Sequence, residues 1–137
     1  MATKPEPLYG LNFSPHSSGG TSSPRKSWED DFVAQWGNVE GLVHQNAKAK
    51  GFWDKERNDG EAIALIHSEA SEALEALRKG NPPDDKIPEF SGAEAELADV
   101  VIRIMDLAAG RKWDISGAIV AKIRHNATRE RLHGKEF

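Results

Sequence analysis

The chain has no cysteine among its 137 residues. This absence excludes disulfide bonds, thiolate nucleophiles and thiolate zinc ligands, and it is typical of a reducing compartment. The sequence also lacks an apolar run of the roughly 20 residues that span a bilayer. The amino terminus has no apolar segment of the kind found in signal peptides. We therefore expect a cytoplasmic protein without membrane segments.

An excess of basic residues is missing as well. Lys and Arg number 18 against 22 Asp and Glu, a formal net charge of −4. A chain of this charge has no general attraction for a nucleic-acid backbone or an anionic membrane. We expect neither polymeric nucleic acid nor a membrane among its partners. The length suits one compact domain.

The first 26 residues contain four of the seven prolines and several Ser, Thr and Gly runs. Such a composition cannot bury enough apolar surface to offset the entropy lost on ordering. We therefore predict a flexible tail over residues 1–26 and a single domain over residues 27–137.

From residue 27 onward, no segment alternates apolar and polar residues with a period of two over any length, which argues against a sheet. Capping residues and glycines instead mark helix starts and stops, including an S-x-x-E capping box at Ser91 and Glu94. An all-α domain is expected. The predicted helices run from Ser27 to Gly51, from Asn58 or Asp59 to Gly80, from Ser91 to Gly110 and from Asp114 to about Arg131.

The second predicted helix places a carboxylate on its apolar face. At about 100° per residue, Glu69 falls inside a continuous apolar arc and Glu72 lies at the edge of that arc. A buried carboxylate costs several kcal/mol unless it is neutralised, paired or bound to a metal. We therefore expect a compensating group at Glu69.

The third predicted helix is apolar around most of its circumference. A helix of this kind is central in a bundle or covered by a second subunit, so its polar stripe is expected to face a site. The alternative is a solvated stripe stabilised by Asp99 and Arg103 at positions i and i+4. The stripe consists of Glu96, Asp99, Arg103 and Asp106.

Two pairs of acids, each spaced i and i+3, lie on these two helices, which are expected to be antiparallel neighbours. Two carboxylates about 5 Å apart repel by roughly 3 kcal/mol at an effective dielectric constant of 20, so a cluster needs a divalent cation or protonation. A ligand set of oxygen atoms alone favours Mg²⁺, with Mn²⁺ as an alternative. The acids are Glu69, Glu72, Glu96 and Asp99.

The fourth predicted helix carries Lys122, Asn126 and Arg129 at positions i, i+4 and i+7, and Lys135 follows in the closing segment. Two cations flanking an amide suit a phosphate chain, particularly beside a metal-binding acid cluster. By itself, such a stripe is more often a solvated face.

These motifs resemble those of a known family. The sequence EASE at 69–72 followed by ELAD at 96–99 is similar to the ExxE and ExxD pair of the all-α nucleoside triphosphate pyrophosphohydrolases, and the chain resembles a small MazG-like member. Three longer segments also resemble this family: LIHSEASEALEALRKGN, ELADVVIRIMDLAA and KIRHNATRERLHGKEF. The resemblance covers residues 28–135 and omits the tail.

The resemblance implies a four-helix bundle-like MazG fold completed by dimerisation, as a dimer or a dimer of dimers. It also implies Mg²⁺-dependent cleavage of a (deoxy)nucleoside triphosphate between the α and β phosphates, giving a monophosphate and pyrophosphate. The implied metal ligands, one of which also orients or deprotonates water, are Glu69, Glu72, Glu96 and Asp99, and the implied phosphate-binding residues are Lys122, Asn126, Arg129 and Lys135.

Three aromatic residues are candidates for stacking on the nucleobase, which the motifs do not identify. Trp53 is preferred because it lies in a glycine-bounded loop, with Phe52 beside it. Trp36 shares a helical stripe with Phe32, so core packing is the favoured role for Trp36.

Two other functions compete with the enzyme. One is a nucleotide-sensing or regulatory oligomer that binds a triphosphate without cleaving it, and the intact set of metal ligands argues against it. The other is a purely structural helical oligomer with solvated acids. The position of Glu69 inside an apolar arc argues against the structural oligomer.

Overall fold

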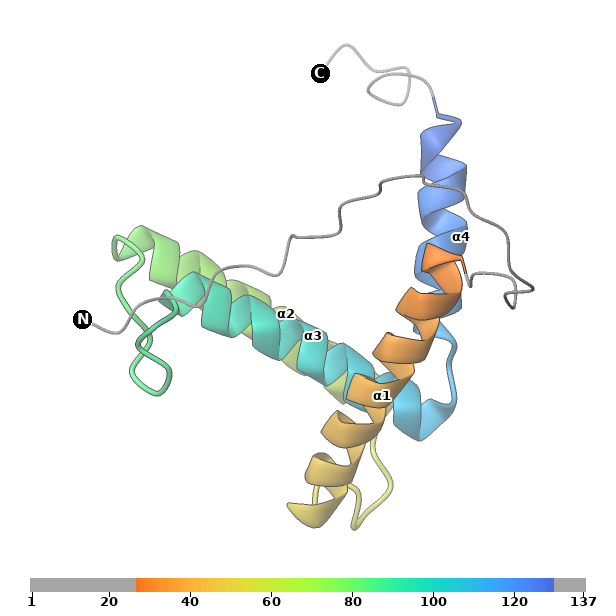
Figure 1. The fold of residues 1–137 in the computed structure, drawn as a ribbon. Coiled ribbons are helices and arrows are strands. Elements are labelled where there is room, and N and C mark those ends of the chain that lie inside the picture. The colour runs from red at the N-terminus through yellow and green to blue at the C-terminus, as the bar shows by residue number, and fades with distance from the viewer. Residues whose placement is uncertain (1–26, 130–137) are drawn as a thin grey trace, which may run out of the picture.

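The computed structural model describes residues 27–129, which form four α-helices and no β-strand. The all-α prediction is therefore confirmed over this range. The predicted tail at 1–26 and the candidate Lys135 lie outside the described residues. The helices are α1 (Trp28–Ala49), α2 (Asp59–Arg78), α3 (Gly92–Arg111) and α4 (Ile115–Ala127), as Figure 1 shows.

The helix starts agree with the capping residues in the sequence. Ser27 and Ser91 each form a complete capping box with the acid three residues later. The side chain of Asn58 accepts a hydrogen bond from the backbone N–H of Glu61, and Asp114 caps α4 in the same way. Local side chains therefore determine where each helix begins.

Two helix ends differ from the prediction. Helix α3 continues through Gly110 to Arg111 and ends at Lys112, which adopts a left-handed φ of 57°. A Cβ atom at Gly110 would lie 2.0 Å from Cη2 of Trp53, so the glycine allows an indole ring to pack closely and does not stop the helix.

Helix α4 ends at Ala127, before the predicted end near Arg131. The hydroxyl of Thr128 donates a 2.7 Å hydrogen bond to the carbonyl of His125, and the backbone N–H of Thr128 contacts the same carbonyl. This tight turn closes the helix. Arg129 therefore lies beyond the helical face that was predicted to carry it.

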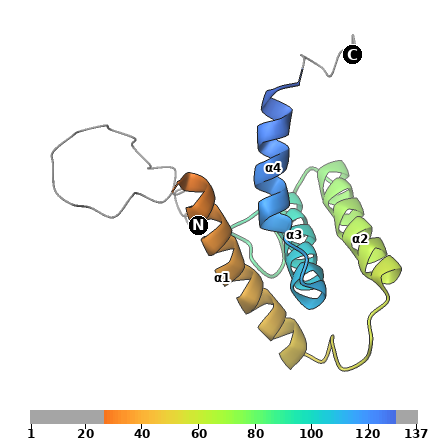
Figure 2. The same ribbon diagram turned by 90° about the vertical axis from the view of Figure 1, so that its right-hand side faces the viewer.

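The helices form two pairs that cross. Helices α2 and α3 lie side by side and antiparallel, and α1 packs across α3 (Figure 1). Helix α4 packs on α1 and runs away from the α2 and α3 pair in both ribbon views (Figure 2). Over residues 27–129, the four helices of one chain therefore do not close a four-helix bundle.

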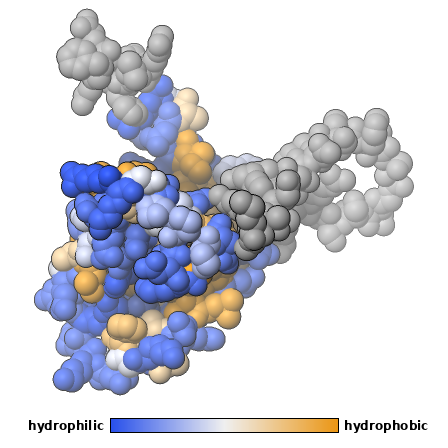
Figure 3. Space-filling view, turned by 90° about the vertical axis from the view of Figure 1, so that its left-hand side faces the viewer, coloured by the Kyte–Doolittle hydropathy of each residue, from blue (hydrophilic) through white to orange (hydrophobic). Residues whose placement is uncertain are grey.

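Small residues dominate the buried core, with Met105, Leu107 and Val120 as the larger members. Large apolar side chains stay at the surface of the single chain: Leu77 is 56% exposed and Leu97 is 54% exposed. Figure 3 shows apolar patches set among hydrophilic residues on one face. None of the described helices is long and apolar enough to cross a membrane.

A buried carboxylate joins α1, α3 and the segment that follows α1. One oxygen of Asp106 lies 2.8 Å from Nδ1 of His44 and accepts a 2.8 Å hydrogen bond from the indole N–H of Trp53. The other oxygen accepts a 2.8 Å hydrogen bond from Arg57. This junction links α1 to α3 through side chains that are far apart in the sequence.

Replacing Asp106 by Asn is expected to lower the free energy of unfolding by about 3 kcal/mol, because the guanidinium of Arg57 would lose its anionic partner in a buried setting. Urea unfolding followed by circular dichroism measures this change. Asp85→Asn, at an exposed position between α2 and α3, is the control. Equal unfolding midpoints for Asp106→Asn and wild type would contradict the structural role of the junction.

Candidate metal centre

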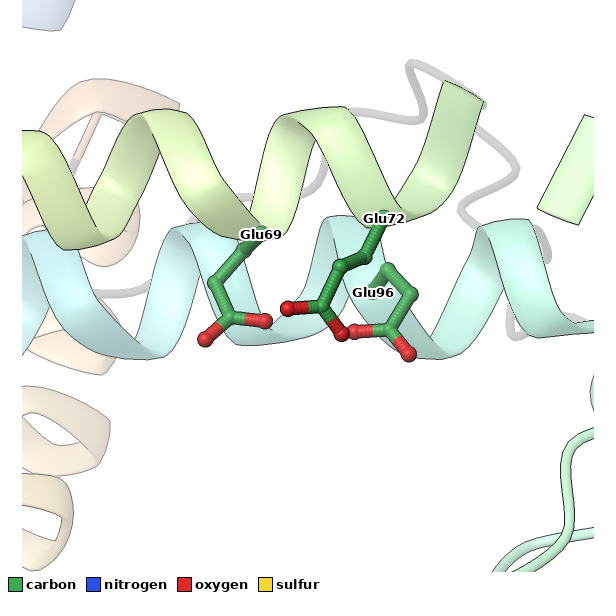
Figure 4. A group of neighbouring side chains, drawn as sticks. All are labelled: Glu69, Glu72 and Glu96. Carbon is green, nitrogen blue, oxygen red and sulfur yellow. The ribbon is translucent and has the colours of Figure 1, made fainter. Parts of the chain in front are cut away.

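Three carboxylates meet where α2 lies against α3. Glu69 and Glu72 come from neighbouring turns of α2, and Glu96 comes from the first half of α3 (Figure 4). Each side chain offers one oxygen, and these oxygens lie within 4.8 Å of one another. The antiparallel pairing of the two helices brings these acids together.

The three acids differ in burial. Glu69 is only 7% exposed, Glu96 is half-buried and Glu72 is exposed. The group is therefore closed by protein on the side of Glu69 and open to solvent on the side of Glu72. A ligand from solution can reach it.

The buried carboxylate of Glu69 is paired with Arg103 of α3. Nε of Arg103 lies 2.6 Å from Oε1 of Glu69, and Nη2 lies 2.5 Å from the same oxygen. The sequence predicts a compensating group at Glu69, and Arg103 is that group in this structure. Arg103 thus pairs across to α2, in place of the pairing with Asp99 along α3 that was the alternative.

Within the cluster, Glu96 is the acid whose pKa is raised. Desolvation by burial is the largest cause that raises the pKa of Glu96 above its ordinary value, followed by the negative charge of Glu72. A hydrogen bond with Glu69 and the charges of Glu69 and Asp99 raise this pKa further. The folded chain without a cation therefore holds a proton at Glu96 more tightly than the unfolded chain does.

This pKa shift has a direct consequence for stability. Because the folded state binds the proton more tightly, the contribution of Glu96 is most favourable at low pH and is lost as pH rises from the ordinary Glu pKa through the raised pKa. In EDTA, Glu96→Gln is expected to remove this decline in unfolding free energy. Urea titrations at a series of pH values measure it, with Glu89→Gln as an exposed control. An unchanged pH dependence in Glu96→Gln would contradict the predicted repulsion.

The fourth predicted ligand, Asp99, is not part of this three-oxygen group. It lies one turn beyond Glu96 on α3, is exposed, and still contributes negative charge at Glu96. The structure thus brings together three of the four acids that the sequence selects.

A cavity of about 210 Å³ is lined by residues of α1, α2, α3 and the segment after α1, and Asp99 is the one of the four predicted acids that lines it. Asp99 and Arg103 line it from α3, and Arg103 also pairs with Glu69 of the acid group. Both apolar and hydrogen-bonding side chains line this cavity. Its lining includes Asn46, Phe52, Arg57, Asp99, Ile102 and Arg103.

The three candidate aromatic residues occupy different places. Phe52 is 61% exposed and lines the cavity. Trp53 is bound to Asp106, and the guanidinium of Arg57 lies 5.1 Å from the centre of its ring. Trp36 donates a 2.7 Å hydrogen bond to Glu40 on α1. Of the three, Phe52 is the one that lines this cavity.

The predicted phosphate-binding residues are not brought to the acids within one chain. Lys122 and Asn126 are exposed on α4, and Arg129 is exposed just after it. Because α4 packs on α1 and extends away from the α2 and α3 pair in Figure 1, the helix that carries Lys122 and Asn126 does not lie against the acid cluster of its own chain.

Sequence reasoning missed two features of this region. The pairing of Arg103 with Glu69 had a signal, because Arg103 was the one cation on a polar stripe facing a buried acid. Arg57 binds Asp106 and lines the cavity, and no signal in the sequence indicated this position because Arg57 lies in a segment without helical periodicity.

The donor set fits a hard divalent cation. Glu69, Glu72 and Glu96 supply only carboxylate oxygens, which suit Mg²⁺ or Mn²⁺ better than Zn²⁺. The open side at Glu72 leaves room for water or phosphate oxygens. Comparisons of the chain with protein-family models, curated proteins and solved structures gave no match.

Proposed function

We propose that the protein is a Mg²⁺-dependent nucleoside triphosphate pyrophosphohydrolase, which cleaves a (deoxy)nucleoside triphosphate between the α and β phosphates. The observation that carries this proposal is the group of three carboxylate oxygens within 4.8 Å of one another. Arg103, which pairs with Glu69 of this group, also lines the cavity. The ExxE and ExxD motifs of MazG-like enzymes, which the sequence resembles, contribute these same acids.

The acids have separate roles in the proposed reaction. A divalent cation at Glu69, Glu72 and Glu96 would polarise phosphate oxygens and offset their charge. Asp99 is exposed, lies outside the three-oxygen group and lines the cavity, so it is suited to orient or deprotonate the attacking water.

The cavity is the proposed place for the nucleobase. Phe52 offers an aromatic face for stacking, and Ile102 adds an apolar wall. The amide of Asn46 and the guanidinium of Arg57 offer hydrogen bonds to polar edges of a base. Trp53 and Trp36 do not line this cavity, so Phe52 is the first of the three candidates to test.

A homodimer, or a dimer of dimers, completes the proposed enzyme. Exposed apolar residues on α2 and α3, such as Leu77 and Leu97, need cover in solution. Helix α4 extends away from the acids of its own chain, so in the proposed dimer Lys122 and Asn126 bind phosphates at the acid cluster of the other copy.

Light scattering at micromolar concentration is therefore expected to give at least twice the mass of one chain, because a second copy would remove these leucines from water. A monodisperse, stable monomer would contradict the proposed assembly.

The experiment that tests the function is a panel of canonical and modified ribonucleoside and deoxyribonucleoside triphosphates incubated with Mg²⁺. Chromatography of the products should show a nucleoside monophosphate and pyrophosphate in equal amounts. Orthophosphate as the first product would contradict cleavage between the α and β phosphates. Tight binding of a triphosphate without turnover would instead support the regulatory alternative.

A further inference from the structure

Arg103 approaches Glu69 in an asymmetric way. Its Nε and Nη2 atoms lie 2.6 Å and 2.5 Å from the same carboxylate oxygen, Oε1. A guanidinium facing a carboxylate commonly contacts both oxygens in two parallel hydrogen bonds. Here the contacts converge on one oxygen, which leaves Oε2 outside the ion pair.

The second oxygen of Glu69 is turned toward the other acids. Figure 4 shows one oxygen of Glu69 directed at Glu72 and Glu96 and the other directed away from them. Arg103 lies about two turns beyond Glu96 on α3, on the side away from Glu72. Arg103 therefore approaches the Glu69 carboxylate from the side away from Glu72, so the oxygen that it contacts, Oε1, is assigned as the one directed away from the cluster.

We propose that Arg103 is a positioning residue, which holds Oε1 of Glu69 so that Oε2 stays directed into the cluster as a cation ligand. This inference rests on the proposed metal-dependent function. Glu69 is 7% exposed, so without Arg103 its carboxylate would lose its ion-pair partner in a buried setting and would be free to rotate away from the cluster. Outer partners of this kind commonly raise metal affinity by about tenfold to a hundredfold.

A positioning role and a purely electrostatic role for Arg103 predict opposite changes in cation affinity when Arg103 is removed. If Arg103 only added a positive charge near the site, or competed with the cation for Glu69, its removal would tighten cation binding. If Arg103 positions Glu69, its removal weakens cation binding. The direction of the change therefore separates the two roles.

The test is calorimetric titration of the full chain with Mn²⁺ alone. Arg103→Gln and Arg103→Ala are expected to weaken Mn²⁺ binding by about tenfold or more. The control is Lys79→Gln, which removes an equal charge from a groove that Glu72 and Glu96 also line. This control should leave binding unchanged or slightly tighter. Unchanged or tighter binding by both Arg103 variants would overturn the proposal.

A second measurement uses only the wild-type chain and does not depend on how the variants fold. The Nε–H proton of Arg103 is expected to stay in slow exchange with water, seen by nuclear magnetic resonance, both before and after saturation with Mg²⁺. Loss of this signal when Mg²⁺ binds would show that Arg103 leaves Glu69, and would overturn the proposal. A wild-type chain that binds neither ion would overturn the proposed function as well, so the two failures are distinguishable.

Discussion

Replacing Glu72 by Gln is expected to lower kcat by about a thousandfold or more while the helix content stays unchanged. The amide keeps the shape of the side chain but removes one anionic ligand from the three-oxygen group. Charge stabilisation by a bound cation is worth several kcal/mol in the transition state, and each 1.4 kcal/mol corresponds to about tenfold in rate. Steady-state kinetics and far-ultraviolet circular dichroism measure the two quantities.

The matched control is Glu75→Gln, because Glu75 is exposed one turn further along α2 and pairs with Lys79 instead of the cluster. Its activity should stay within about threefold of wild type, as expected for a surface ion pair. If the kcat of Glu72→Gln stayed within tenfold of wild type, the proposed role of the acids in the mechanism would be wrong. Equal losses in both variants would point to net charge as the cause.

Replacing Lys122 by Ala is expected to lower kcat/KM by about tenfold to a hundredfold or more, because charge-assisted hydrogen bonds to phosphate are worth roughly 1.5 to 3 kcal/mol. Lys122 is exposed on α4, so the unfolding free energy should barely change. Arg124→Ala is the control of equal charge, since Arg124 pairs with Glu29 of α1. If Arg124→Ala impairs catalysis as strongly, the assigned face of α4 is wrong.

Mixing the two inactive variants tests whether each site is shared between copies. In a dimer where Lys122 serves the acids of the partner, a mixed dimer of Glu72→Gln and Lys122→Ala subunits contains one fully intact site. Random exchange makes half of the dimers mixed, so about a quarter of wild-type activity should return. A mixture that stays inactive although the subunits exchange would place Lys122 and the acids of one site in the same chain.

Local features of the fold were predictable from the sequence because they depend on neighbouring residues. Capping boxes at Ser27 and Ser91 mark helix starts through contacts three residues apart. The apolar arc around Glu69 predicts its burial, since a helix repeats its faces every 3.6 residues. The meeting of Glu69 and Glu96 follows from two such faces on antiparallel neighbours.

Features that depend on contacts distant in sequence were not predictable. In the sequence, Gly110 is typical of a helix end, but in the structure α3 continues past it and the indole of Trp53 packs against it. The single-oxygen contact of Arg103 depends on how far α2 and α3 are displaced along each other. The direction of α4 is set by its packing on α1, which no periodicity in the sequence encodes.

The central proposal, a divalent cation held between α2 and α3, is tested most directly by anomalous X-ray diffraction from crystals of the full chain grown with Mn²⁺. The predicted result is a manganese peak within about 2 to 2.5 Å of carboxylate oxygens from Glu69, Glu72 and Glu96. Ordered density for these three side chains with no manganese peak between them, at Mn²⁺ concentrations that support turnover, would contradict it.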